Sequence, residues 1–256
     1  MGILACKFFD DVGFVGLRIK ERPEKPNVYI RNSYFGGKER VYLWDDILRY
    51  SEGMNEDGVT ILSNNFVNEK IGAEYAKKFI KKKSLNQKPR QIFEITNNIQ
   101  IRKALLSMTA KEAADVLIEY EALGVSVIFN SSECYLLKAV YFENVYYYTL
   151  IPILKDDLLL QVLPLSANKD LSEFIRQLKI TRDYDEFFKY VVPDLRTEQT
   201  SYESLLIPNR KAINFRPVNC NLAFSSSTNS GSENKLTFSI VKKELIKPFQ
   251  LFDLYK

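Results

Sequence analysis

The sequence predicts an α+β protein, and three observations carry this prediction. Short runs of β-forming residues fill the first quarter of the 256-residue chain, amphipathic helical patterns follow, and β-type runs return toward the end. Strands, then helices, then strands is the order expected for helices packed on mainly antiparallel sheets. Neither an internal repeat nor a linker is evident, so we expect residues 1–256 to form a single domain.

The first part of the chain is expected to consist of β-hairpins. Two apolar runs flank Asp10-Asp11, and a Gly36-Gly37 pair separates the next two, which is turn chemistry between strands. Residues 52–58 are rich in turn-forming residues and lead into another apolar run. The strands expected in this part are 3–9, 12–19, 28–33, 40–44 and 59–63.

Helices are expected in the middle of the chain and again after residue 170. Residues 68–83 carry apolar side chains at helical spacing among lysines, which predicts an amphipathic helix with a solvated basic face. Thr109-Ala110-Lys111-Glu112 fits a capping box, which predicts a helix that begins there and ends near Gly124. Further helices are expected at 98–107, 171–178, 184–190 and 202–206.

The remaining apolar runs read as strands. The Ser/Asn/Gly-rich residues 225–234 are expected to form a hairpin loop between the last two of them. The strands expected here are 125–129, 135–141, 145–153, 158–163, 219–224 and 236–241.

Composition excludes several classes of function. The chain has no His, which excludes Ser-His-Asp and Cys-His hydrolases and most zinc sites. Its three cysteines, Cys6, Cys134 and Cys220, are far apart and lack C-x-x-C spacing, so neither a disulfide framework nor a metal site is expected. With 36 basic and 32 acidic residues the net charge is +4, so we expect no nucleic-acid partner. No cofactor is implied.

The sequence also indicates a location. No apolar run reaches the length of a membrane-spanning helix, and Lys7 interrupts the apolar start before a signal-peptide core develops. We therefore expect a cytoplasmic protein without a membrane partner. Residue usage rich in Lys, Asn, Ile, Tyr and Phe is typical of a low-GC genome, such as that of a phage or a low-GC bacterium, and a phage protein could be virion-associated.

Two motifs resemble the cysteine branch of the N-terminal-nucleophile (Ntn) hydrolases, which includes choloylglycine hydrolase, penicillin V acylase and the isopenicillin N acyltransferases. Residues 16–23 read Gly-Leu-Arg-Ile-Lys-Glu-Arg-Pro, similar to the family's Arg-Asn-x-Asp strand, with Ile19 in place of the Asn and Glu21 in place of the Asp. Residues 52–59, Glu-Gly-Met-Asn-Glu-Asp-Gly-Val, resemble the family's Glu-Gly-Met-Asn-Glu-x-Gly turn closely.

The resemblance implies a fold and a chemistry. The fold is a four-layer αββα sandwich of two antiparallel sheets covered by helices. In active members the first residue is a Cys whose own α-amino group serves as the base in attack on an amide carbonyl, so no His is needed. The site residues implied for an active chain are Cys6, Arg18, Glu21, Asn65 and Arg210, acting on a small linear amide.

Two registers of the opening hairpin lead to different functions. If the first strand starts directly after Met1, the Asp10-Asp11 turn and the distance to Arg18 match the family without a gap, and Gly2 occupies the nucleophile position. A glycine cannot form an acyl-enzyme, so the chain would be an inactive structural or interaction subunit. If residues 1–5 are removed, Cys6 becomes the nucleophile and the chain is an amidohydrolase or acyltransferase.

We favour the inactive reading because the second register shortens the first strand by four residues. The changes at Ile19 and Glu21 favour it too, since a longer side chain moves the carboxylate out of position. An inactive subunit needs a protein partner or a second copy of itself. The dense aromatic residues Tyr141, Phe142, Tyr146, Tyr147 and Tyr148 are the first candidate for that contact surface, and the apolar tail 248–255 is the second.

Overall fold

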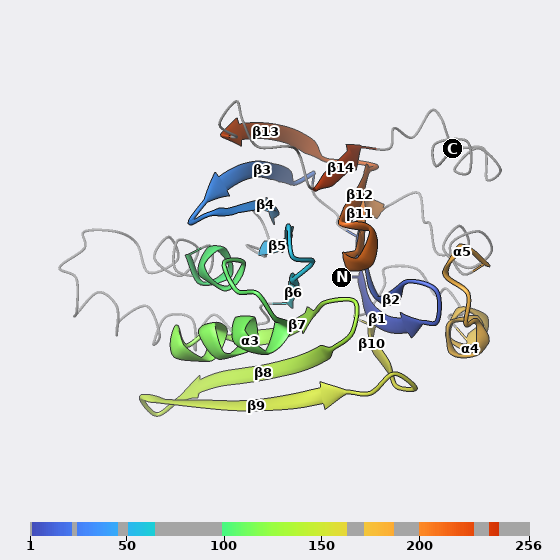
Figure 1. Cartoon of the computed structure of the whole chain (residues 1–256), viewed down its shortest axis with the longest axis horizontal. Coiled ribbons are helices and arrows are strands. Elements are labelled where there is room, and N and C mark those ends of the chain that lie inside the picture. The colour runs from blue at the N-terminus through green and yellow to red at the C-terminus, as the bar shows by residue number, and fades with distance from the viewer. Residues whose placement is uncertain are drawn as a thin grey trace.

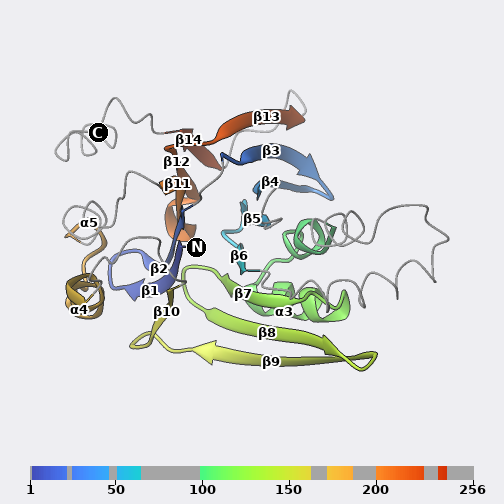
Figure 2. The ribbon, with the colours of Figure 1, turned by 180° about the vertical axis from the view of Figure 1, so that it is seen from behind.

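The computed structural model describes residues 2–21, 25–45, 51–64, 99–162, 172–186, 200–227 and 236–240. Their strands form two large sheets (Figures 1 and 2). The first sheet has the strand order β10 (Leu158–Val162), β1 (Gly2–Phe9), β2 (Gly13–Glu21), β11 (Thr200–Ile207), β12 (Ala212–Pro217) and β14 (Thr237–Ile240). The second has the order β13 (Asn221–Ser227), β3 (Asn27–Phe35), β4 (Lys38–Asp45), β5 (Ser51–Asn55), β6 (Thr60–Asn64), β7 (Gly124–Phe129), β8 (Cys134–Phe142) and β9 (Val145–Ile153).

The α+β prediction is confirmed, but the sheets are mixed rather than purely antiparallel. β12 pairs with β14 in parallel, and β13 pairs with β3 in parallel, while the other described neighbours are antiparallel. The expected hairpin between the last two strands is therefore wrong. β13 and β14 follow each other in the chain but join opposite sheets, so each adds to an edge strand that is distant in sequence.

One hydrophobic core lies between the two sheets, and the outer face of each sheet is covered by its own helices. Alternate side chains point to opposite faces of a strand, so β1 sends Leu4 and Cys6 toward the second sheet and Ile3 and Ala5 away from it. The outer side of the first sheet packs against α4 (Ser172–Ile180) and α5 (Tyr184–Glu186) through Leu178 and Tyr184. The outer side of the second sheet packs against α3 (Ala110–Glu119).

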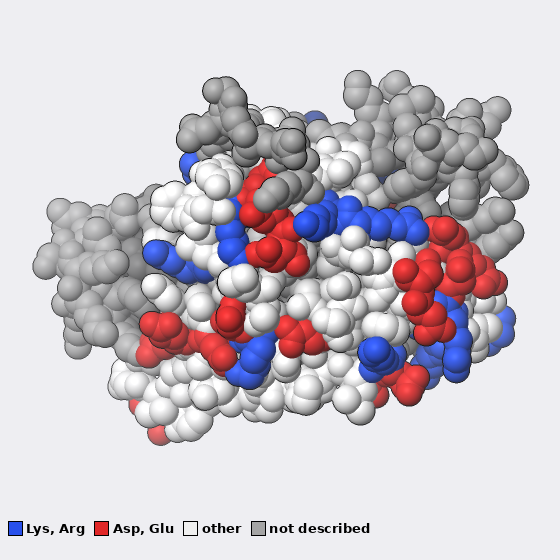
Figure 3. Space-filling view, viewed as in Figure 1, with Lys and Arg blue, Asp and Glu red and all other residues white. Residues whose placement is uncertain are grey.

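Figures 1 and 2 show the same arrangement from both sides, with α3 on one flank and α4 on the other. None of the described helices is long and apolar enough to cross a bilayer. Basic and acidic side chains lie among one another on the face seen in Figure 3, in keeping with the small net charge.

The opening hairpin and the capping box are confirmed. β1 and β2 pair over their whole length, with Phe9 opposite Gly13. At the start of α3 the Thr109 side chain accepts a hydrogen bond from the Glu112 N–H, and the Glu112 carboxylate accepts one from the Thr109 N–H, which satisfies two donors that a helix start leaves free. The helix buries Ala113 and Leu117 against the second sheet, and Val116 is partly buried there.

Three expectations are corrected. Residues 202–206, expected to be a helix, lie in β11, which is buried on both faces between β2 and β12 and so lacks the alternation that marks a strand. Residues 51–55 form β5 rather than part of a turn. The strand β12 was not predicted, because its Asn, Arg and Pro residues interrupt the run of β-forming residues that indicates a strand. The helix expected at 68–83 lies outside the described residues, as does the tail 248–255.

Candidate functional site

A cluster of buried polar side chains lies between the two sheets beside the start of β1. Arg18 on β2, Glu52 on β5 and Ser204 on β11 are its centre, and all three are buried. The Arg18 Nε lies 3.5 Å from Glu52 Oε2, and the Ser204 hydroxyl donates to Glu52 Oε1 at 2.8 Å. Arg18 and Ser204 face each other in the register of β2 and β11. The cluster therefore joins three strands from both sheets through one carboxylate.

The guanidinium of Arg18 makes a further contact with the second sheet. Its Nη1 donates to the Ser63 carbonyl at 2.5 Å, and the Ser63 hydroxyl lies 3.1 Å from that of Ser126 on β7. A buried charge is tolerated only when its partners replace the water that it has lost. Arg18 meets this condition with Glu52 and Ser63, so its contacts are those of a structural ion pair.

A second polar chain lies two residues further along β2. Lys20 Nζ donates to the Tyr202 hydroxyl, which donates to Asp45 Oδ2 at 3.1 Å. Lys20, Tyr202 and Asp45 are each at most 2% exposed. Residues 18 and 20 share one face of the strand, so both cations point between the sheets and each is matched by an acidic side chain.

Gly2 begins β1 at the edge of this cluster. It lies opposite Lys20 in the register of β1 and β2. A Cβ built on Gly2 would lie 2.0 Å from the Ile19 carbonyl oxygen, so a side chain at this position collides with the backbone of β2. The strand start has room for a glycine only.

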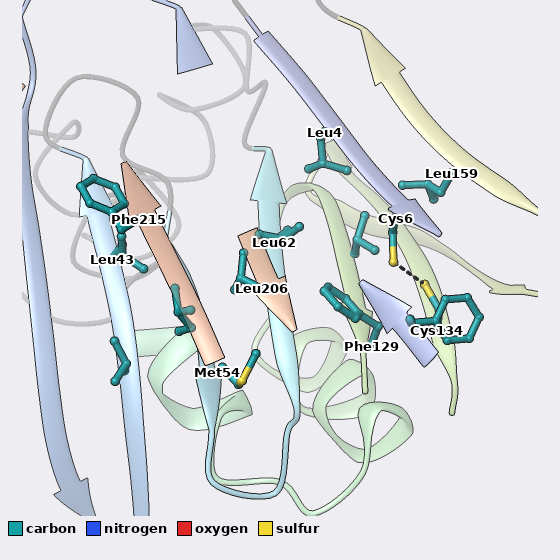
Figure 4. Packing of buried hydrophobic residues seen from close by; sticks show 14 of the residues in the cluster. Leu4, Cys6, Leu43, Met54, Leu62, Phe129, Cys134, Leu159, Leu206 and Phe215 are labelled. Carbon is teal, nitrogen blue, oxygen red and sulfur yellow. Dashed lines mark hydrogen bonds between the residues drawn. The ribbon is translucent and has the colours of Figure 1, made fainter. Parts of the chain in front are cut away.

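Cys6 lies in the middle of β1, away from the polar cluster. It pairs with Gly16 on one side and Leu159 on the other, whereas Arg18 lies opposite Leu4. Its side chain is fully buried, and its Sγ lies 3.7 Å from the Sγ of Cys134 (Figure 4). Burial raises the pKa of the Cys6 thiol well above its ordinary value, and Cys134 raises it further. Both cysteines are free thiols.

The other residues implied by the resemblance are not brought to Arg18. Glu21 is the last residue of β2, opposite Thr200. Arg210 lies at the end of a short 3-10 turn, where its Nη2 is 3.4 Å from Asp185 Oδ1 and its guanidinium lies over the Tyr184 ring. It therefore faces α5 on the outer side of the first sheet. Asn65 lies outside the described residues.

Sequence reasoning identified Arg18 but not the residues that surround it. Glu52 and Lys20 were quoted only as members of longer motifs, and Asp45 and Tyr202 were not recognised as polar partners. The alternation of Arg18 and Lys20 with apolar residues on β2 is the one pattern that marks a polar face there. Within the described ranges, no three His, Cys, Asp or Glu side chains are grouped so that they could hold a metal ion.

The cluster can brace the sheets, but it offers no reactive thiol. Its ionisable groups are paired with one another, the thiol of Cys6 lies in apolar surroundings two residue pairs away, and the start of β1 has no side chain. Comparison with known proteins adds no relative: the chain matches no family model and none of the curated proteins.

Proposed function

We propose that this protein is a catalytically inactive member of the Ntn-hydrolase fold that acts as an interaction subunit. The αββα assignment is supported by the shared core between the two sheets and by α3 and α4 on their outer faces. The continuous pairing of β1 with β2 from Gly2 onward supports the register that needs no gap.

The observation that carries the proposal is the start of β1. Gly2 occupies the nucleophile position in that register, and the Ile19 carbonyl fills the space that a side chain would need. The alternative nucleophile, Cys6, is 0% exposed and packs against Leu4, Phe129 and Cys134 in the core shared by the sheets (Figure 4). An acyl-enzyme requires a thiolate that an amide carbonyl can reach.

Intact mass after alkylation separates the two readings. The native protein, treated with iodoacetamide at neutral pH, is expected to begin at Met1 or Gly2 and to leave Cys6 unmodified, because burial raises the pKa of this thiol and blocks access to it. After unfolding in guanidinium, Cys6 is expected to react fully, which serves as the control. A mature chain that begins at Cys6 and is alkylated there in the native state would contradict the proposal.

The hairpin of β8 and β9 is the interaction surface that we infer. Phe142, Tyr147 and Tyr148 are 57%, 52% and 53% exposed, whereas Tyr141 is buried and the Tyr146 hydroxyl donates to the Ala122 carbonyl. Three of the five aromatic residues expected to form a contact surface are therefore exposed. Val140, Val145 and Ile151 add exposed apolar area to the same hairpin, and the exposed Leu154 follows directly after β9.

The position of β9 favours a second copy of this chain as the partner. Among the described strands β9 ends the second sheet and pairs only with β8, and it lies at the periphery in both ribbon views (Figures 1 and 2). Its nine residues, Val-Tyr-Tyr-Tyr-Thr-Leu-Ile-Pro-Ile, carry no charge, although edge strands usually carry one to prevent pairing. Pro152 cannot donate to a ladder, so the part of β9 that can pair is residues 145–151. Antiparallel pairing of β9 with its own copy forms a two-fold interface and places Tyr147 and Tyr148, which point to opposite faces of the strand, beside side chains of the second copy.

Sedimentation velocity tests this interface. The wild type is expected to sediment as a dimer at high micromolar concentration, and a Tyr147→Lys/Thr149→Lys variant as a monomer, because like charges then face each other across the two-fold axis. Tyr34→Lys/Ile180→Lys, at exposed apolar positions on β3 and α4, adds the same two charges away from β9; it is the matched control and should remain dimeric. A monomeric wild type, or a dimer in both variants, would exclude this use of β9.

A further inference from the structure

A pocket on the outer face of the second sheet is independent of both the polar cluster and the β9 edge. Its volume is about 440 Å³, which lies within the range of small-molecule sites. It forms where β3 and β4 meet the helical residues 99–104. The side chains that line it include Tyr29 and Arg31 from β3, Tyr42 and Trp44 from β4, and Ile99 and Arg102 from the helical segment.

One wall of the pocket is a pair of stacked aromatic rings. Tyr29 and Trp44 lie opposite each other in the register of β3 and β4, with ring centroids 4.8 Å apart and planes inclined by 29°. Tyr29 is 40% exposed, so the residue is accessible to a ligand in the pocket. Such a pair offers a flat apolar surface on which a planar ring can stack.

Two arginines, Arg31 and Arg102, give the lining of the pocket a positive charge beside the aromatic wall. Within the described part of the chain, neither the Arg31 nor the Arg102 guanidinium is ion-paired with a carboxylate. Arg102 is held over the Tyr42 ring at 6.0 Å, and Arg31 is paired with Tyr42 in the register of β3 and β4.

A third arginine, Arg40, lies close enough to Arg31 and Arg102 for their charges to affect it. Burial lowers the pKa of Arg40, and the charges of Arg102 and Arg31 lower it further. The Arg40 Nη1 donates to the Arg102 carbonyl, and its Nε to the Ser33 hydroxyl at 3.3 Å. Arg40 thus holds the helical segment against the sheet, while Arg31 and Arg102 face the pocket.

We propose that this pocket binds an aromatic phosphate of the size of a nucleoside monophosphate. The ring stacks on Tyr29 beside Trp44, and the phosphate lies between Arg31 and Arg102, whose forked donors match phosphate oxygens. A dianionic phosphate balances two guanidiniums, whereas a monocarboxylate balances one. The site does not depend on the proposed function, since it uses neither Gly2 nor β9.

Trp44 is the only tryptophan of the chain, so its fluorescence reports on this pocket directly. Titration with AMP and UMP is expected to quench it in a saturable way. Adenosine, which lacks the phosphate, is expected to bind at least about tenfold more weakly, and inorganic phosphate alone should leave the emission unchanged. The pair AMP and adenosine separates the contribution of the phosphate from that of the ring.

The variant Arg31→Met/Arg102→Met should weaken AMP binding by about tenfold or more and leave adenosine binding unchanged. The matched control is Lys111→Met/Lys138→Met, which removes the same charge from exposed positions on α3 and β8. Thermal unfolding of each variant shows whether it is folded. If the wild type shows no saturable quenching, if adenosine quenches as well as AMP does, or if the folded arginine variant keeps its AMP affinity, the proposal is wrong.

Discussion

Replacing Glu52 with Met is expected to lower the free energy of unfolding by about 3–5 kcal/mol, among the largest effects of any single substitution in this chain. Arg18 would keep its charge between the sheets but lose its carboxylate, and the Ser204 hydroxyl would lose its acceptor. The loss is large because Arg18 and Glu52 are 4% and 1% exposed at their side chains, so water cannot replace the missing partner. Urea denaturation followed by circular dichroism measures it.

The double variant Arg18→Met/Glu52→Met is the control for this prediction. It removes both charges and fills the space with apolar atoms, and a buried ion pair can often be replaced in this way at little cost. We expect the double variant to be more stable than Glu52→Met alone by at least about 2 kcal/mol, which is a large coupling energy for a pair in contact. Equal stability of the single and double variants would show that Arg18 does not depend on Glu52.

The double variant also tests whether the pair does more than join the sheets. If Arg18 and Glu52 only brace the two sheets, the double variant keeps the fold and the oligomeric state, which circular dichroism and sedimentation velocity measure.

Local signals in the sequence predicted local structure. The Asp10-Asp11 turn placed the first hairpin, and the Thr109–Glu112 capping box placed the start of α3, because both depend on residues close in the chain. β11 escaped prediction because a strand buried on both faces has no period to detect. The parallel pairing of β13 and β14 with strands of opposite sheets is a property of the whole fold, which no local pattern encodes.

The contacts of the polar cluster could not be predicted from local sequence patterns either, because they join residues far apart in the chain. Arg18 could be singled out from a motif, but its partner Glu52 is 34 positions away and on the other sheet. Lys20 reads as an ordinary surface lysine until Tyr202 and Asp45, far along the chain, are placed beside it. The contact of Cys6 with Cys134 spans 128 positions and has no C-x-x-C spacing to announce it.

Replacing Phe129 with Ala should lower the free energy of unfolding by a comparable amount, about 3–5 kcal/mol, because it opens a cavity in the core between the two sheets. Phe129 lies on β7 of the second sheet and is fully buried. A Cβ built on Gly16 of β2 would lie 2.5 Å from its Cζ and 2.8 Å from Leu62 Cδ1, so the ring packs directly on the backbone of the first sheet. Urea denaturation should show a lower midpoint with an unchanged slope.

The same contact predicts a dependence between two residues on opposite sheets. Gly16→Ala alone should destabilise by about 1–3 kcal/mol, since the added methyl has no space beside the ring. Gly16→Ala combined with Phe129→Leu should lose less than the sum of the two single changes, because the smaller side chain makes room for the methyl. Strictly additive losses would mean that the sheets are not packed through this pair. Gly16 lies opposite Cys6 in the register of β1 and β2, and Phe129 and Cys6 belong to the same buried cluster, so this packing contributes to the burial that raises the pKa of the Cys6 thiol.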